Sequence, residues 1–289
     1  MTRALVTKMT EGMMTRVAAA IVLLLASPCT ARAEWTPIAP GLEYGEFQAC
    51  SPSSHDDSKI TVVRVVPHQV QLRILSAADL GLPGPLRAEE WAERFDLSLV
   101  INAGLFAADW RTHLGYLKIQ DGHVNNPTVR QDYKSVLVFD PLAPGQPEAG
   151  ILDAEHTTIP ELSAKYGAVV QNLRIVRSPG TVVWSRSPRK WSEAAVGMDR
   201  SGRLLFIFCR SPYTMHELGQ CLLSLPLDLV AVQHLEGGGD ASLVIRTQSM
   251  RKILVGSYES GANDGIAKPY EVITKGFPLP NVLVVSARR

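Results

Sequence analysis

The sequence has 289 residues, of which 46% are hydrophobic and 20% charged, which are the proportions of an ordinary globular protein. Its formal net charge is +1 and it has no basic tract, so we expect no nucleic-acid partner. Low-complexity tracts and internal repeats are absent, which argues against disordered and repeat proteins.

Residues 1–33 have the pattern of a cleavable signal peptide. Three basic residues precede the apolar run Val17–Ala26, and the small residues of Ala31–Ala33 follow as a cleavage signal. A run of about ten apolar residues is too short to span a bilayer. The sequence therefore predicts a periplasmic or secreted protein whose mature domain is 34–289, with no transmembrane segment after cleavage.

Removal of the leader changes the charge and cysteine counts. The whole chain has 29 basic and 28 acidic residues, and the leader contains four of the basic residues and one of the acidic residues. The mature chain therefore keeps 25 basic and 27 acidic residues. Three cysteines also remain, Cys50, Cys209 and Cys221. An odd number of cysteines in an oxidising compartment implies either one free thiol beside a disulfide or no disulfide at all. Whether Cys209 pairs with Cys221 stays open.

The first half of the mature chain favours strands. Residues 59–67 and 70–75 are expected to form a hairpin, 87–96 a helix, and 97–102 a buried strand that ends at Asn102. The dipeptide Asp121-Gly122 predicts the turn of a second hairpin.

The second half contains further strands and the clearest helix signal. Strands are expected at 133–141 and 168–176 around a short helix near 160–166, and a hairpin is expected to turn at 199–202. Thr214 and Glu217 have capping-box spacing at the start of a helix that ends before Pro226. Many strands and few helices predict an α+β fold, a single domain with a mixed, mainly antiparallel sheet.

The stretch "QHLEGGGDASLVI" places three glycines between Glu236 and Asp240 and between two apolar runs. Glycine loses more backbone freedom on folding than any other residue, so three consecutive glycines destabilise a fold unless a backbone without side chains serves a purpose at that place. An apolar segment follows instead of a helix, so phosphate-loop and dinucleotide motifs do not fit. The carboxylate pair suits glycoside chemistry or a divalent cation such as Ca²⁺, and Gly237, Gly238 and Gly239 would offer amides to a ligand; a structural turn is the alternative.

Two other stretches carry candidate site residues. The segment after the strand that ends at Asn102 contains Phe106, Asp109, Arg111 and His113. Polar side chains at the end of a buried strand often form sites, although an amide such as Asn102 often serves loop backbone groups instead. Arg210 precedes the capped helix, where it suits an anionic group or a surface salt bridge, and His216 lies in the first helical turn.

Three stretches together resemble the phosphodiester glycosidase domain family, in particular its exported bacterial branch. They are "INAGLF…LGYLKIQDGHVNNP", "AVGMDRSGRLLFIFCRSPYTMHELGQCLLSLPL" and "LVAVQHLEGGGDASLVI", in the order and spacing of that family. The resemblance spans roughly residues 59–287. It implies catalytic or binding roles for Asn102, Arg210, Glu236, Gly237 and Gly238.

Two departures from the family pattern concern the glycine loop. Glu236 stands where the family more usually has Asp, and Gly239, Asp240 and Ala241 stand where serines often follow. The resemblance implies an exported hydrolase that cleaves a sugar-1-phosphodiester or a related envelope saccharide. A non-catalytic saccharide-binding protein is the alternative, and a structural envelope protein would leave the glycine run unexplained. No metal spacing is recognised, so a Ca²⁺ requirement, the sugar and its anomer remain open.

Overall fold

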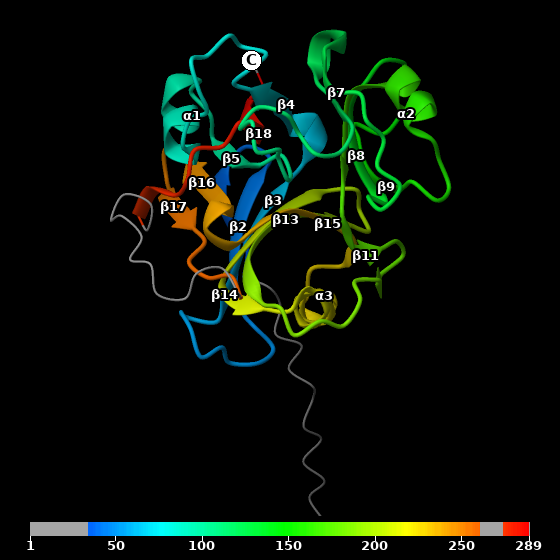
Figure 1. Ribbon diagram of the computed structural model, residues 1–289. Helices are drawn as coiled ribbons and strands as arrows, with labels where there is room; N and C mark the ends of the chain where they lie inside the picture. The colour runs from blue at the N-terminus through cyan, green and yellow to red at the C-terminus, as the bar shows by residue number, and fades with distance from the viewer. Residues whose placement is uncertain (1–33, 261–273, 289) are drawn as a thin grey trace, which may run out of the picture. The chain divides into compact units, whose positions relative to one another are not determined.

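The computed structural model describes residues 34–260 and 274–288. The predicted signal peptide, 1–33, lies outside the described residues. Within them the strands form three sheets of eight, five and five strands, and every strand pair is antiparallel (Figure 1). The α+β class and the antiparallel character are confirmed, but the expected single sheet is replaced by three.

The first and largest sheet carries the glycine loop at the end of one of its inner strands. Its strands, in spatial order, are β1 (Thr36–Ala39), β2 (Leu42–Gln48), β3 (Lys59–Val65), β14 (Leu204–Tyr213), β13 (Trp191–Asp199), β15 (Leu229–Gly237), β11 (Arg174–Arg177) and β12 (Thr181–Val182).

The two smaller sheets supply the loops around that strand end. The second sheet has the order β7 (Val124–Asn126), β6 (Leu117–Lys118), β10 (Tyr166–Asn172), β8 (Ser135–Pro141) and β9 (Ala149–Asp153). The third has the order β17 (Arg251–Val255), β16 (Ser242–Arg246), β5 (Leu99–Asn102), β18 (Asn281–Ala287) and β4 (Val70–Ser76).

The main hydrophobic core joins all three sheets, and each helix packs on a face of one of them. Val63, Leu137 and Ile101 represent the three sheets in this core. The helices are α1 (Ala88–Arg94) on the third sheet, α2 (Ile159–Lys165) on the second and α3 (Met215–Ser224) on the first. None of the helices in the described part of the chain is long and apolar enough to cross a membrane.

The helix predicted from its capping box is confirmed. The Thr214 hydroxyl accepts a hydrogen bond from the backbone N–H of Glu217, and the Glu217 carboxylate accepts one from the backbone N–H of Thr214. Both contacts satisfy donors that the first turn of a helix leaves unpaired. The apolar side chains of Leu218 and Leu222 are buried against the first sheet.

The predicted hairpin of residues 59–67 and 70–75 is wrong in its pairing. Both segments are strands, but β3 pairs with β2 and β14 in the first sheet, whereas β4 pairs with β18 in the third. The 3₁₀ turn Pro67–Gln69 separates them. Both strands are apolar, and periodicity alone does not tell which sheet a strand joins.

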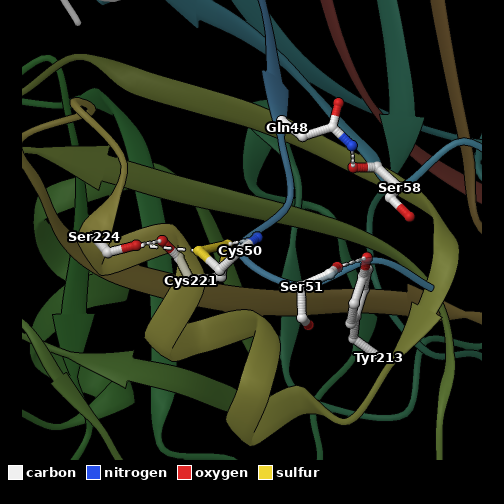
Figure 2. The surroundings of a disulfide bond; sticks show 7 residues. All are labelled: Gln48, Cys50, Ser51, Ser58, Tyr213, Cys221 and Ser224. Carbon is white, nitrogen blue, oxygen red and sulfur yellow. Dashed lines mark hydrogen bonds between the residues drawn. A yellow bond between two sulfur atoms is a disulfide. The ribbon is translucent and has the colours of Figure 1, made fainter.

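The three cysteines of the mature chain form one disulfide and leave one free thiol. Cys50, which follows β2, forms a disulfide with Cys221 of α3, and Cys209 is free and buried (Figure 2). The Tyr213 hydroxyl donates a hydrogen bond to the carbonyl oxygen of Ser51 at 2.7 Å, and Figure 2 marks this bond with a dashed line. The disulfide therefore ties the segment after β2 to the helix that covers the first sheet.

Candidate functional site

The glycine loop connects the first sheet to the third. Strand β15 ends at Gly237, the 3₁₀ turn Gly238–Asp240 follows, and β16 begins at Ser242. Asn102, at the end of β5, holds this connection from the neighbouring strand. Its Nδ2 donates to the carbonyl oxygen of Asp240 at 2.9 Å, and its Oδ1 accepts from the N–H of Ser242 at 2.8 Å. The amide of Asn102 thus serves loop backbone groups and fixes the loop position.

Two of the three glycines are required by the protein's own packing. A Cβ on Gly237 would lie 2.5 Å from Cδ1 of Trp191, so the indole occupies the space that a side chain would fill. Gly238 has a φ of +66°, and a Cβ there would lie 2.8 Å from the carboxylate of Glu259. Trp191 and Glu259 therefore lie against the loop backbone.

Glu236 is a buried carboxyl that favours its protonated form. It is 7% exposed. Burial raises its pKa well above the ordinary value of 4.5, the negative charge of Asp240 raises it further, and a hydrogen bond from the N–H of Gly237 lowers it. Glu193 and Glu259 add smaller effects that also raise this pKa. Glu236 therefore keeps a proton at pH values where an exposed glutamate has lost it.

A histidine–glutamate pair lies at the same end of β15 as Glu236, and the sequence analysis did not identify it. His234 Nδ1 is 2.6 Å from Glu193 Oε1, and the indole N–H of Trp191 donates to Glu193 Oε2 at 2.8 Å. Glu193 is fully buried and His234 is 4% exposed. Burial raises the pKa of Glu193 above its ordinary value, and its interactions with His234 and Trp191 offset only part of this effect. His234 stands only two residues before Glu236 in the quoted stretch, whereas no spacing connects Glu193 to it.

His113 lies behind the end of β5 as a neutral imidazole. It is completely buried, and burial lowers its pKa to about 4. Its Nε2 is 3.0 Å from the carbonyl oxygen of Gln171, which requires Nε2 to carry the hydrogen, and Nδ1 is left without a partner. The nearby Asn172 donates to the carbonyl oxygen of Ala103, the residue after Asn102. His113 therefore supports the strand end that carries Asn102.

Three predicted residues lie on a loop of their own. The Asp109 carboxylate accepts hydrogen bonds from Thr112 and from the N–H of Arg111, and these bonds lower its pKa. The Phe106 ring lies 5.1 Å from that of Trp110, which is exposed. These contacts hold the turn together, and a role in substrate binding stays a prediction for Phe106, Asp109 and Arg111.

Arg210 lies near the end of β14, and His216 lies in the first turn of α3. Arg210 lines a cavity of about 500 Å³ with Asp56, Asp57 and Lys59, and neither Glu236 nor Asp240 lines that cavity. His216, on α3, has Nδ1 3.0 Å from the carbonyl oxygen of Trp184. A larger cavity of about 900 Å³, lined by Arg73, Arg246 and Arg288 among others, contains none of the predicted site residues.

The structure brings together Asn102, Glu236, the glycines and Asp240 as the sequence predicted, with Glu193, His234, Trp191 and Glu259 added. A group of three or more His, Cys, Asp or Glu side chains able to hold a metal ion does not occur within residues 34–260 and 274–288. Chemically, the arrangement offers two buried carboxyls whose pKa values are raised by burial, Glu236 and Glu193, together with the Asp240 carboxylate and an imidazole that is hydrogen-bonded to Glu193. Groups with such different proton affinities are suited to acid–base chemistry.

Comparisons with known proteins agree on the kind of fold. The catalytic domain of zebrafish N-acetylglucosamine-1-phosphodiester alpha-N-acetylglucosaminidase, auto-inhibited by its pro-peptide, matches with a TM-score of 0.57 at 16% identity, over 89% of this chain and 87% of that one. A hypothetical protein from Synechocystis matches with a TM-score of 0.55 at 15% identity, over 86% of this chain and 62% of that one. At these identities the similarity concerns the fold alone.

The sequence itself provides the family assignment. A search of curated proteins gave no match. The family model described as phosphodiester glycosidase matches residues 95–286, which is more than half of the chain and includes β5, β13, β14 and β15. The three stretches that carry the resemblance lie within this range or overlap it. The chain therefore belongs to the phosphodiester glycosidase family.

Proposed function

We propose that the protein is an exported hydrolase that cleaves the bond between a sugar and a phosphodiester, or a related envelope saccharide. The observation that carries this proposal is the buried carboxyl of Glu236, whose pKa is raised by burial and by Asp240. Family membership supports a glycosidase with a saccharide-type substrate. The substrate binds against the glycine loop.

Cleavage at the anomeric carbon expels a phosphate monoester, which is a competent leaving group. The site therefore needs less general-acid assistance than an ordinary glycosidase. Glu236 supplies a proton to the leaving phosphate oxygen, and the Asp240 carboxylate stabilises positive charge that develops on the sugar. Asn102 holds both groups in position through the backbone of the loop. Arg210 remains our candidate for the phosphate contact.

Export is proposed on two grounds. Residues 1–33 have the pattern of a signal peptide, and the Cys50–Cys221 disulfide is of the kind that persists in oxidising compartments. The test is the N-terminal sequence of the protein recovered from outside the cytoplasm. A start at Glu34 supports export, and an intact leader in the cytoplasm contradicts it.

The activity is tested by release of free sugar from a panel of sugar-1-phosphodiesters, nucleotide sugars included. Purified 34–289 is compared with Glu236→Gln, and with Glu148→Gln as a control for an exposed glutamate, each with and without a chelator. We expect turnover by the parent and the control and its loss in Glu236→Gln. Loss with chelator would reveal a metal requirement such as Ca²⁺. Saccharide-induced stabilisation without turnover would favour the binding-protein alternative.

A further inference from the structure

The cavity of about 900 Å³ lies at the end of the third sheet that is farther from the glycine loop. Ser98, which lines this cavity, directly precedes β5, whereas Asn102 at the other end of β5 holds the glycine loop. At about 3.3 Å per residue, the strand from Ser98 to Asn102 spans about 13 Å. The cavity is therefore separate from the candidate site on the glycine loop.

One wall of the cavity is a row of polar residues that crosses four strands of the third sheet. The N–H of Ser98 donates to the carbonyl oxygen of Val285, and the carbonyl oxygen of Ser98 accepts from the N–H of Arg246. Residues two positions farther along the strands, such as Val284 and Val244, pack in the core beneath α1. Since residues two apart share a face of a sheet, the row lies on the face that α1 covers. We call these residues the polar row: Gln71, Ser286, Ser98 and Arg246.

Arg73 lies on the same face as the polar row and lines the same cavity. It stands two residues after Gln71 on β4, so both side chains leave the strand on one side. Within residues 34–260 and 274–288 its guanidinium has no hydrogen-bond or ion-pair partner, and its Nε is fully buried. A buried donor without a partner is unfavourable, and an oxyanion bound in the cavity would supply that partner.

Two other arginines line the cavity, and both already contact carboxylates. Arg246 Nη1 lies 2.8 Å from Asp96 Oδ1, and Arg288 Nη2 lies 3.8 Å from Glu148 Oε2. Arg73 is therefore the guanidinium of this cavity that is available to a ligand. On the face that α1 covers, the two arginines and Asp96 leave one positive charge in excess.

The acidic residues Asp140 and Glu148 line the cavity from the other side of β4. They come from the second sheet and the residue before β9, and the second sheet packs on the face of the third sheet to which Leu72 points. Leu72 and Arg73 are adjacent on β4 and so point to opposite faces. Because β4 is the edge strand of its sheet, the cavity extends around it. An anion beside Arg73 is therefore separated by β4 from these carboxylates.

We propose that this cavity binds a saccharide that carries an acidic group, a phosphate or a carboxylate. The acidic group contacts Arg73, and the sugar hydroxyls contact the polar row, whose serine and glutamine side chains both donate and accept hydrogen bonds. In the described part of the chain, the Ser98 hydroxyl has no other partner. The ring of Phe95, at the end of α1, also lines the cavity and offers an apolar surface to a sugar ring. No bond is broken here, so the inference goes beyond the proposed hydrolase function.

The test measures binding by calorimetry to the mature chain, 34–289. The probes are glucose 6-phosphate, glucuronate, neutral glucose and inorganic phosphate. Glucose 6-phosphate lacks the sugar-1-phosphodiester bond that the proposed hydrolase cleaves, so its binding is independent of that activity. We expect at least one of the two acidic sugars to bind more tightly than both glucose and inorganic phosphate, and the tighter acidic sugar identifies the acidic group.

The variants show whether the bound sugar lies in this cavity. Arg73→Gln should weaken binding of the acidic sugar by about tenfold or more, as for loss of charge-assisted hydrogen bonds. The matched control is Arg251→Gln on the neighbouring β17, because Arg251 pairs with Glu89 and Glu93 outside the cavity. The control should bind like the parent. If Arg73→Gln is less stable than the parent, Arg73→Lys replaces it and should also weaken binding, because lysine cannot present the planar fork of arginine.

Three results would overturn the inference. The first is equal affinity of the parent and the Arg73 variant for the acidic sugar. The second is inorganic phosphate that binds as tightly as the acidic sugars, which would show a site for an anion alone. The third is no binding of either acidic sugar by the parent. All three leave the hydrolase proposal intact, which is tested on other substrates and with Glu236→Gln.

Discussion

Gly237 shows how a single missing side chain shapes the site. The Trp191 indole lies against its Cα, and the same indole donates a hydrogen bond to Glu193. A methyl group on Gly237 would displace the ring and with it the support of the Glu193–His234 pair. The sequence analysis expects the glycine run to offer backbone amides to a ligand. The run also leaves space for side chains from residues that are distant in the sequence.

Gly237→Ala should therefore destabilise the fold and reduce activity. Overpacking of a filled site typically costs about 1–3 kcal/mol. Urea unfolding of the variant measures this loss, and Gly84→Ala is the control because a Cβ there meets no atom within 4 Å. The control should remain within about 0.5 kcal/mol of the parent. Equal stabilities for the two variants would show that Trp191 moves away at no cost.

The raised pKa of Glu236 makes stability depend on pH in a defined direction. Between the ordinary value of 4.5 and the raised pKa, the folded chain holds a proton that the unfolded chain has released. The stabilisation that the Glu236 proton gives the folded chain is therefore fully present below pH 4.5, and it is lost as the pH rises through the raised pKa. Glu236→Gln carries no such proton.

We expect the stability of Glu236→Gln relative to the parent to increase with pH above 4.5, although the variant is inactive. Denaturant unfolding of both proteins over a pH series gives the difference directly. A difference that is constant with pH would mean that Glu236 titrates like an ordinary glutamate in the folded protein. The activity of the parent should fall over the same rise in pH, because Glu236 acts in its protonated form.

At the scale of elements, Asn102 connects β5 to the glycine loop and to β16. Asn102→Ala leaves the carbonyl of Asp240 and the N–H of Ser242 without this partner. A buried group left unpaired costs about 1–3 kcal/mol. Thermal unfolding should therefore place Asn102→Ala below the parent. Equal unfolding temperatures for the two proteins would contradict the assigned contacts.

Local signals explain why many elements could be predicted. The capping box at Thr214, the turn at Asp121-Gly122 and the hairpin at 199–202 each depend on residues a few positions apart. The strand ending at Asn102 was recognised from its apolar run, and the glycine loop from its composition. The separation of β3 from β4 depends instead on pairing with β14 and β18, which no local pattern encodes.

At the scale of the whole molecule, the site is assembled from sequence-distant parts that meet only after folding. Glu236 and Asp240 could be found because they share one loop, and the family resemblance is confirmed by the match over 95–286. Glu193 could not be found from the sequence, because its partner His234 is 41 residues away and lies on a different strand. The division into three sheets escaped prediction for the same reason, since it is set by long-range pairing.

The disulfide is the longest covalent constraint, closing a loop with a sequence separation of 171 residues. If it acts by restricting the unfolded chain, it contributes about 5 kcal/mol for a loop of this length. We expect a reductant to destabilise the parent and Cys209→Ala by the same amount, and to leave the double variant Cys50→Ala/Cys221→Ala unaffected. Cys209 is the matched control because it is buried but unbridged.

Thiol counting on denatured 34–289 provides a test that is independent of stability. The chain contains Cys50, Cys209 and Cys221, and only Cys209 is free. One reactive thiol should therefore appear without reductant and three after reduction. Three thiols before reduction, in protein purified from an oxidising compartment, would show that the Cys50–Cys221 bridge does not form. The segment after β2 would then be held to α3 only by non-covalent contacts such as the hydrogen bond from Tyr213 to Ser51.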